Sequence, residues 1–214
     1  MMNNLLSIYE TLFAHYGNLN WWPAKTSYEV IVGAILTQNT NWNNVEKAIA
    51  NFGDDITPEF VMNAGFDELA SIIRPAGFFN QKTGYLKAVT TWFSDYSYDV
   101  STVQGISPDI LRNELLSVKG IGPETADSVL LYAFDFPTFV VDAYTLRLCK
   151  RFSIDAGDKY ADVKSFFENN LPKNTELYNN FHACIVINAK EHCRKNNPLC
   201  VDCPLSAECN KYGV

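Results

Sequence analysis

Apolar residues recur at helical spacing along almost the whole chain, and no segment alternates convincingly with the period of two that marks a strand. The segment from Tyr28 to about Thr37 is apolar nearly all round, which predicts a buried helix. The pattern predicts further helices near residues 5–13, 43–52, 66–73, 81–93, 108–118, 123–133, 143–151, 162–169 and 176–192, and one that starts at residue 58. The sequence therefore predicts an all-α protein with an irregular tail.

Local signals mark where several of these helices begin. Ser27 and Asp142 precede helical patterns, and a serine or aspartate in that position accepts a hydrogen bond from the first free backbone N–H groups. Pro58, Pro108 and Pro123 stand where a first helical residue is expected, because proline has no N–H to lose there.

Length and charge set limits on the class of protein. With 214 residues the chain can form one domain with two lobes. No run of 18 apolar residues occurs and the first residues lack a secretion signal, so we expect an intracellular, cytoplasmic protein that does not cross a membrane. The formal net charge, 17 − 24 = −7, argues against an overall basic surface for nucleic acid, although basic residues gather at 147–151 and at 190–195.

Four cysteines near the end of the sequence are the sharpest chemical signal. Cys193, Cys200, Cys203 and Cys209 follow the spacing C-x6-C-x2-C-x5-C. Clustered thiolates in an intracellular protein favour a metal centre over disulfides or free thiols. Zinc sites commonly use two CxxC pairs, whereas only the central pair has that spacing here. A [4Fe–4S] cluster is therefore favoured over zinc.

A glycine-rich break between two predicted helices is the second signal. In Lys119-Gly120-Ile121-Gly122-Pro123 the glycines permit backbone conformations closed to other residues and allow a ligand to approach closely. The helix that follows presents free N–H groups, which suit a DNA phosphate. Many such breaks are only connectors, so the motif alone is weak evidence.

Asp142 is the third signal, and it lies 20 residues after Gly122. By itself it is a helix cap. A carboxylate held ionised by the start of a helix can also serve catalysis, and the hairpin and cysteine tail together favour that second interpretation.

These motifs, in this order, resemble the endonuclease III group of helix–hairpin–helix/Gly-Pro-Asp DNA glycosylases over essentially the whole chain. The resemblance implies an all-α fold of two helical lobes: a six-helix barrel over residues 21–133 that contains the hairpin, and a lobe of residues 1–20 and 134–214 that carries the cluster loop. It implies double-stranded DNA with a damaged base as partner, action as a monomer, and association with the nucleoid.

The resemblance also assigns residues. Asp142 is the catalytic aspartate, Gln38 enters the DNA gap, and Phe78 of the Gly77-Phe78-Phe79-Asn80-Gln81-Lys82 turn is the wedge. Gly120, Gly122 and Thr125 contact the DNA backbone. The carbonyls of Leu116, Val118 and Ile121 hold a sodium or potassium ion.

One departure from the family pattern concerns the chemistry. Bifunctional members carry a lysine two residues after the second hairpin glycine, where it forms a Schiff base with the sugar. This sequence has Glu124 there, a residue placed at the base pocket and unable to form an imine. Lys119 precedes the first glycine and is not expected to replace the missing amine. The sequence therefore predicts a monofunctional enzyme without lyase activity.

Tryptophans point to the substrate. Trp21-Trp22-Pro23 and Trp42, which follows the Gln38 loop, resemble the 3-methyladenine branch, in which aromatic rings sandwich the flipped base. Any one of them is as readily explained by core packing, and some members of that branch lack the cysteine cluster. Three alternatives remain open: a thymine or uracil mismatch glycosylase, a non-catalytic DNA-binding iron–sulfur protein, and a zinc-stabilised interaction module.

Overall fold

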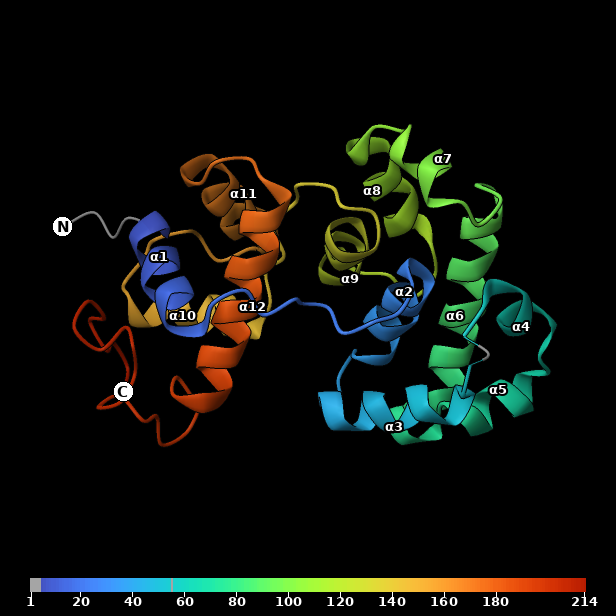
Figure 1. The fold of residues 1–214 in the computed structure, drawn as a ribbon, viewed down its shortest axis with the longest axis horizontal. Helices are drawn as coiled ribbons and strands as arrows, with labels where there is room; N and C mark the ends of the chain where they lie inside the picture. The colour runs from blue at the N-terminus through green and yellow to red at the C-terminus, as the bar shows by residue number, and fades with distance from the viewer. Residues whose placement is uncertain (1–4, 55) are drawn as a thin grey trace. The chain divides into compact units, whose positions relative to one another are not determined.

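The computed structural model describes residues 5–54 and 56–214, and every regular element among them is helical (Figure 1). This confirms the all-α expectation. The helices are α1 (Leu5–Tyr16), α2 (Ser27–Leu36), α3 (Trp42–Phe52), α4 (Pro58–Asn63), α5 (Phe66–Ile72), η1 (Arg74–Ala76), α6 (Phe79–Ser94), α7 (Val100–Gln104), α8 (Pro108–Ser117), α9 (Pro123–Ser128), η2 (Val129–Ala133), α10 (Ala143–Arg151), α11 (Tyr160–Asn170) and α12 (Thr175–Glu191). None of them is long and apolar enough to cross a membrane.

The chain divides into two compact units. The central unit is Trp22–Phe136, and the terminal unit combines the described part of Met1–Trp21 with Pro137–Val214. The terminal unit is therefore built from two stretches of sequence that the whole central unit separates.

Helix α2 lies at the centre of the central unit's core, where it packs against α3, α6, α9 and η2. Its residues from Tyr28 to Leu36, apart from Glu29, are buried, as its apolar sequence predicts. The predicted cap was wrong by one residue: Thr26 has an extended backbone and its side chain accepts the Glu29 N–H at 3.1 Å, while Ser27 is already helical.

Three short elements were not predicted. Helix α7 has five residues, too few to display a helical period, and Asp99 caps it. Arg74–Ala76 form a 3-10 turn. The helix expected over 123–133 is α-helical only to Ser128 and continues as a π-helix over Val129–Ala133.

In the terminal unit α12 is the central helix, and α1 and α10 pack against it (Figure 1). Helix α1 buries Leu5, Ile8 and Leu12, which recur at the spacing of one helix face. Residues 193–214 form only turns and irregular structure, as expected for a cysteine-rich tail that is interrupted by Pro198 and Pro204.

Candidate functional site

The hairpin between α8 and α9 needs glycine at one of its two positions. Gly120 has φ +89°, and a Cβ there would stand 2.2 Å from the Tyr85 ring. Gly122 has φ −96°, which any residue adopts, and a Cβ there would meet nothing within 4 Å. The expectation that both glycines supply unusual backbone conformations was therefore wrong for Gly122, whose missing side chain instead leaves open space at the start of α9.

Gln38 ties its own loop to this hairpin. Its amide Nε2 donates to the Gly120 carbonyl at 2.9 Å and to the Thr125 hydroxyl at 3.0 Å. The structure thus brings together three residues, Gln38, Gly120 and Thr125, for which the family resemblance implies DNA contact.

Lys82 connects the same region to the turn that carries Phe78. The Lys82 side chain is 2% exposed, and its ammonium donates to the carbonyls of Leu36 and Ala76, both at 2.8 Å. Burial lowers the pKa of Lys82 to about 8. The sequence marked Lys82 only as part of a motif and gave no sign of these two contacts.

The three carbonyls expected to hold a monovalent cation belong to the hairpin backbone. Val118 already accepts the Ile121 N–H at 3.1 Å, which closes the turn. A carbonyl has two lone pairs, so this bond leaves one for a cation.

Phe78 is an exposed aromatic side chain on a strained backbone. It is 61% exposed, has φ +46°, and stands immediately before α6. The left-handed conformation is unfavourable for a bulky residue and typically accompanies a functional constraint. Its neighbour Phe79 instead lies against Arg74, whose guanidinium is 4.8 Å from the ring centre.

Asp142 caps α10, as predicted, and both of its carboxylate oxygens are engaged. Oδ1 accepts the N–H groups of Tyr144 and Thr145 at 2.9 and 2.8 Å and the Thr145 hydroxyl at 3.1 Å. Oδ2 lies 3.5 Å from Nε2 of His182 on α12. Burial opposes the charge of Asp142, but His182 and the Thr145 donors hold the pKa of this carboxyl below its ordinary value.

His182 was missed in the sequence because it stands within an apolar run of α12 and reads as a core residue. It is 6% exposed, and only the packing of α10 against α12 brings it to Asp142. A carboxylate and an imidazole side by side and shielded from water suit a site that needs a fixed anion.

The three tryptophans expected at the base pocket separate into two groups. Trp22 and Trp42 meet edge to face with ring centres 5.3 Å apart, and Trp22 also contacts Tyr132. They line a cavity of about 350 Å³, and Glu124 is not among the residues of its wall. Trp21 belongs to the terminal unit, where Lys190 lies 5.7 Å above its ring.

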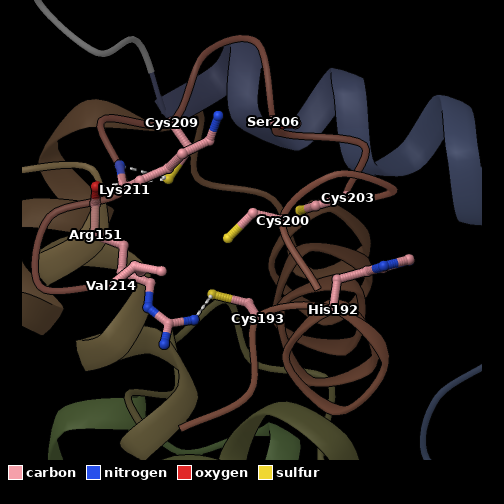
Figure 2. A pocket seen from close by; sticks show the side chains of 9 residues that line it. All are labelled: Arg151, His192, Cys193, Cys200, Cys203, Ser206, Cys209, Lys211 and Val214. Atoms are coloured by element: carbon pink, nitrogen blue, oxygen red, sulfur yellow. Dashed lines mark hydrogen bonds between the residues drawn. The ribbon is translucent and has the colours of Figure 1, made fainter. Parts of the chain in front are cut away.

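The four predicted cysteine ligands surround one cavity of about 280 Å³ in the terminal unit (Figure 2). Arg151 donates to the Cys193 sulfur at 2.9 Å, and Arg147 donates to the Cys193 carbonyl at 2.7 Å. Among the described residues, no three cysteine, histidine or acidic side chains converge tightly enough for a single metal ion.

The profile of the HhH-GPD superfamily base excision DNA repair proteins matches residues 32–173. A protein of Methanocaldococcus jannaschii named as a candidate DNA repair glycosylase is 48% identical over 96% of this chain and 95% of its own length.

Two solved structures extend the comparison. The 3-methyladenine DNA glycosylase of H. pylori, bound to 1,N6-ethenoadenine, is 27% identical, with a TM-score of 0.74 over 87% of this chain and 97% of that one. A trapped endonuclease III–DNA covalent intermediate has a TM-score of 0.81 over 98% of this chain and 97% of that one. At 22% identity this second likeness concerns the fold alone.

Proposed function

Because the chain belongs to the HhH-GPD superfamily of base excision DNA repair proteins and is a DNA glycosylase, we propose that it is a monofunctional enzyme that excises alkylated purines. It flips a base such as 3-methyladenine out of double-stranded DNA and hydrolyses the N-glycosidic bond. The product is an abasic site in an intact strand.

The residue at position 124 carries the monofunctional part of the proposal. Glu124 lies in the first turn of α9, where its negative charge is favourable and where it cannot form an imine. The buried Lys82 does not serve as the missing amine, because its side chain is 2% exposed and is bonded to two carbonyls. Water is therefore the nucleophile.

Asp142 supplies the charge that this reaction needs. As the N-glycosidic bond breaks, its electron pair moves to the departing base and positive charge develops on the sugar. A carboxylate held ionised by the Thr145 donors and His182 stabilises that charge and orients or deprotonates the attacking water. Since its oxygens are fixed before substrate arrives, little reorganisation is needed during the reaction.

The hairpin, Gln38 and Phe78 would hold the distorted duplex. The open space at Gly122 lets a phosphate approach the backbone of α9. Phe78 fills the gap left by the flipped nucleotide, which is consistent with its exposed and strained position. For Gln38 to enter the gap, its two bonds to Gly120 and Thr125 are exchanged for bonds to the DNA bases.

Cys193, Cys200, Cys203 and Cys209 would hold a [4Fe–4S] cluster. Its contribution when bound is structural, because it fixes the loop that carries Arg194 and Lys195. The carbonyls of Leu116, Val118 and Ile121 would hold a sodium or potassium ion that fixes the hairpin.

The cavity lined by Trp22 and Trp42 carries the substrate part of the proposal. A purine alkylated at a ring nitrogen is cationic, and a tryptophan face attracts a cation by about 0.5–2 kcal/mol. Such a base is already a good leaving group, so no strong general acid is required. The similarity to a 3-methyladenine DNA glycosylase supports the same substrate class.

Base release from methylated duplex DNA tests the proposal, with uracil and thymine-mismatch duplexes assayed in parallel. Free 3-methyladenine, with strand nicking only after alkali, is the expected result. Nicking without alkali would show that another amine acts as a lyase. Release of uracil or thymine alone would identify a mismatch glycosylase, and no release from any duplex would leave a DNA-binding protein.

A further inference from the structure

The wall of the tryptophan-lined cavity contains two carboxylates that sequence reasoning did not single out. Glu29 on α2 and Glu46 on α3 line the cavity together with Trp22 and Trp42. The cavity is open to solvent on one side. None of the described residues in its wall is basic.

The indole walls are fixed. A Cβ at Gly33 would stand 3.1 Å from Nε1 of Trp22, so this indole lies directly on the α2 backbone. The Trp42 indole N–H donates to Oε1 of Glu46 at 2.9 Å, one helical turn away on α3. That bond orients the Trp42 ring and the Glu46 carboxylate together.

Each carboxylate keeps one oxygen without a partner among the described residues. Glu29 accepts the Lys25 backbone N–H through Oε2 at 2.9 Å, and Glu46 accepts only the Trp42 N–H. Neither forms an ion pair in the described structure; the nearby Lys25 ammonium is paired with Asp54 instead. Two uncompensated negative charges therefore border a cavity with aromatic walls.

We propose that Glu29 and Glu46 make this cavity selective for purines that carry a positive charge. The proposal rests on the proposed function, in which this cavity receives the flipped base. Ring-alkylated purine nucleotides are cations, whereas 1,N6-ethenoadenine, hypoxanthine and uracil are neutral. The carboxylates and the indole faces attract the same charge, so their preferences reinforce each other.

The timing of the charge gives the proposal a kinetic signature. Bond cleavage returns an electron pair to the base, so the cation present on binding is a neutral base on release. The carboxylates therefore assist binding of the substrate and do not retain the product. Their removal raises KM for cationic lesions and leaves kcat unchanged or slightly higher.

The variants Glu46→Gln and Glu29→Gln test this, because glutamine keeps an oxygen for the Trp42 and Lys25 N–H groups while removing the charge. Glu59→Gln, on the first turn of α4 and outside the cavity wall, is the matched control. For release of 3-methyladenine and 7-methylguanine, each cavity variant lowers kcat/KM by about two- to fivefold, the range expected for a solvent-accessible charge pair. Release of 1,N6-ethenoadenine is unchanged, and Glu59→Gln has no effect on either class. An equal loss on cationic and neutral lesions, or no loss on either, would overturn the proposal.

A binding measurement separates this inference from the proposed function. Quenching of tryptophan fluorescence by 7-methylguanosine, cationic at mildly acidic pH, is compared with quenching by neutral guanosine. We expect tighter binding of the cation, with the difference reduced in the Glu29→Gln/Glu46→Gln double variant. If the protein binds the cation in this way but excises no alkylated purine, the proposed function fails and the cavity's preference stands. If alkylated purines are excised but the wild type binds both nucleosides alike, the preference fails alone.

Discussion

The two hairpin glycines allow the fold and the DNA contact to be tested separately. In Gly120→Ala the new residue must adopt φ +89°, which costs about 1–2 kcal/mol for an L-residue. Its Cβ also overlaps Cγ and Cδ of Tyr85 at 2.2 Å. These atoms lie at the base of the side chain, so the ring cannot swing clear by a small rotation. Overpacking of this kind adds about 1–3 kcal/mol.

The expected loss for Gly120→Ala is therefore about 2–5 kcal/mol of unfolding free energy, measured by urea or thermal unfolding. Gly122→Ala is the control, because its backbone is ordinary and the space is open. Restricting the unfolded chain stabilises by about 0.4–1 kcal/mol, but alanine is a poorer residue than glycine at the N-cap of α9, so the free energy of unfolding changes by less than about 1 kcal/mol. DNA affinity should nevertheless fall in Gly122→Ala, since a methyl group now stands where the phosphate approaches. Equal destabilisation by the two variants would refute the structural reasoning, and unchanged DNA affinity in Gly122→Ala would refute the role given to that space.

Further outcomes follow from the site. Asp142→Asn should lower turnover at least about a hundredfold while DNA binding persists, and near-normal excision would remove Asp142 from the mechanism. Folding lowers the pKa of Asp142, so the ionised carboxylate stabilises the fold above the ordinary carboxyl pKa, and this stabilisation is lost as pH falls through the lower folded pKa. His182 contributes to that lowering, so His182→Gln should raise the pKa of Asp142 and move the acid limb of the pH–rate profile to higher pH. An unmoved acid limb would contradict the pairing of Asp142 with His182. Phe78→Ala should change stability by less than about 0.5 kcal/mol because the side chain is exposed, yet slow excision from paired duplex, with partial recovery when the lesion lies opposite an abasic site; full activity on paired duplex would exclude the wedge role. Cys203→Ser should abolish the visible absorbance of the purified protein, whereas a colourless wild type that binds zinc would exclude the iron–sulfur cluster.

The long helices could be predicted from the sequence because the spacing of their apolar residues shows which face is buried. Helix α2 is the clearest case, since its apolar residues leave few alternatives to full burial. Boundaries were less certain where neighbouring residues compete: Thr26 and Ser27 both suit a cap, and backbone geometry decides for Thr26. The π-helical turn at Val129–Ala133 leaves no mark in an apolar pattern that either helix type accommodates.

Contacts between residues far apart in the sequence could not be predicted from local sequence patterns. Gln38 reaches the carbonyl of Gly120, 82 positions later, and neither residue alone indicates the other. His182 looks like part of a core helix until α10 is packed beside it. The acidic wall of the tryptophan cavity was missed for the same reason, because Glu29 and Glu46 appear in sequence as ordinary polar positions on two separate helices.

The discontinuous terminal unit has a consequence for how the chain folds during synthesis. The central unit is one continuous stretch, Trp22–Phe136, and can become compact as soon as that stretch has left the ribosome. Helix α1 is made before the central unit and its main partner α12 after it, so the apolar face formed by Leu5, Ile8 and Leu12 remains exposed while residues 17–174 are synthesised. During that interval the nascent chain exposes a hydrophobic helix face that is prone to aggregation, and chaperone binding would protect it most in this period.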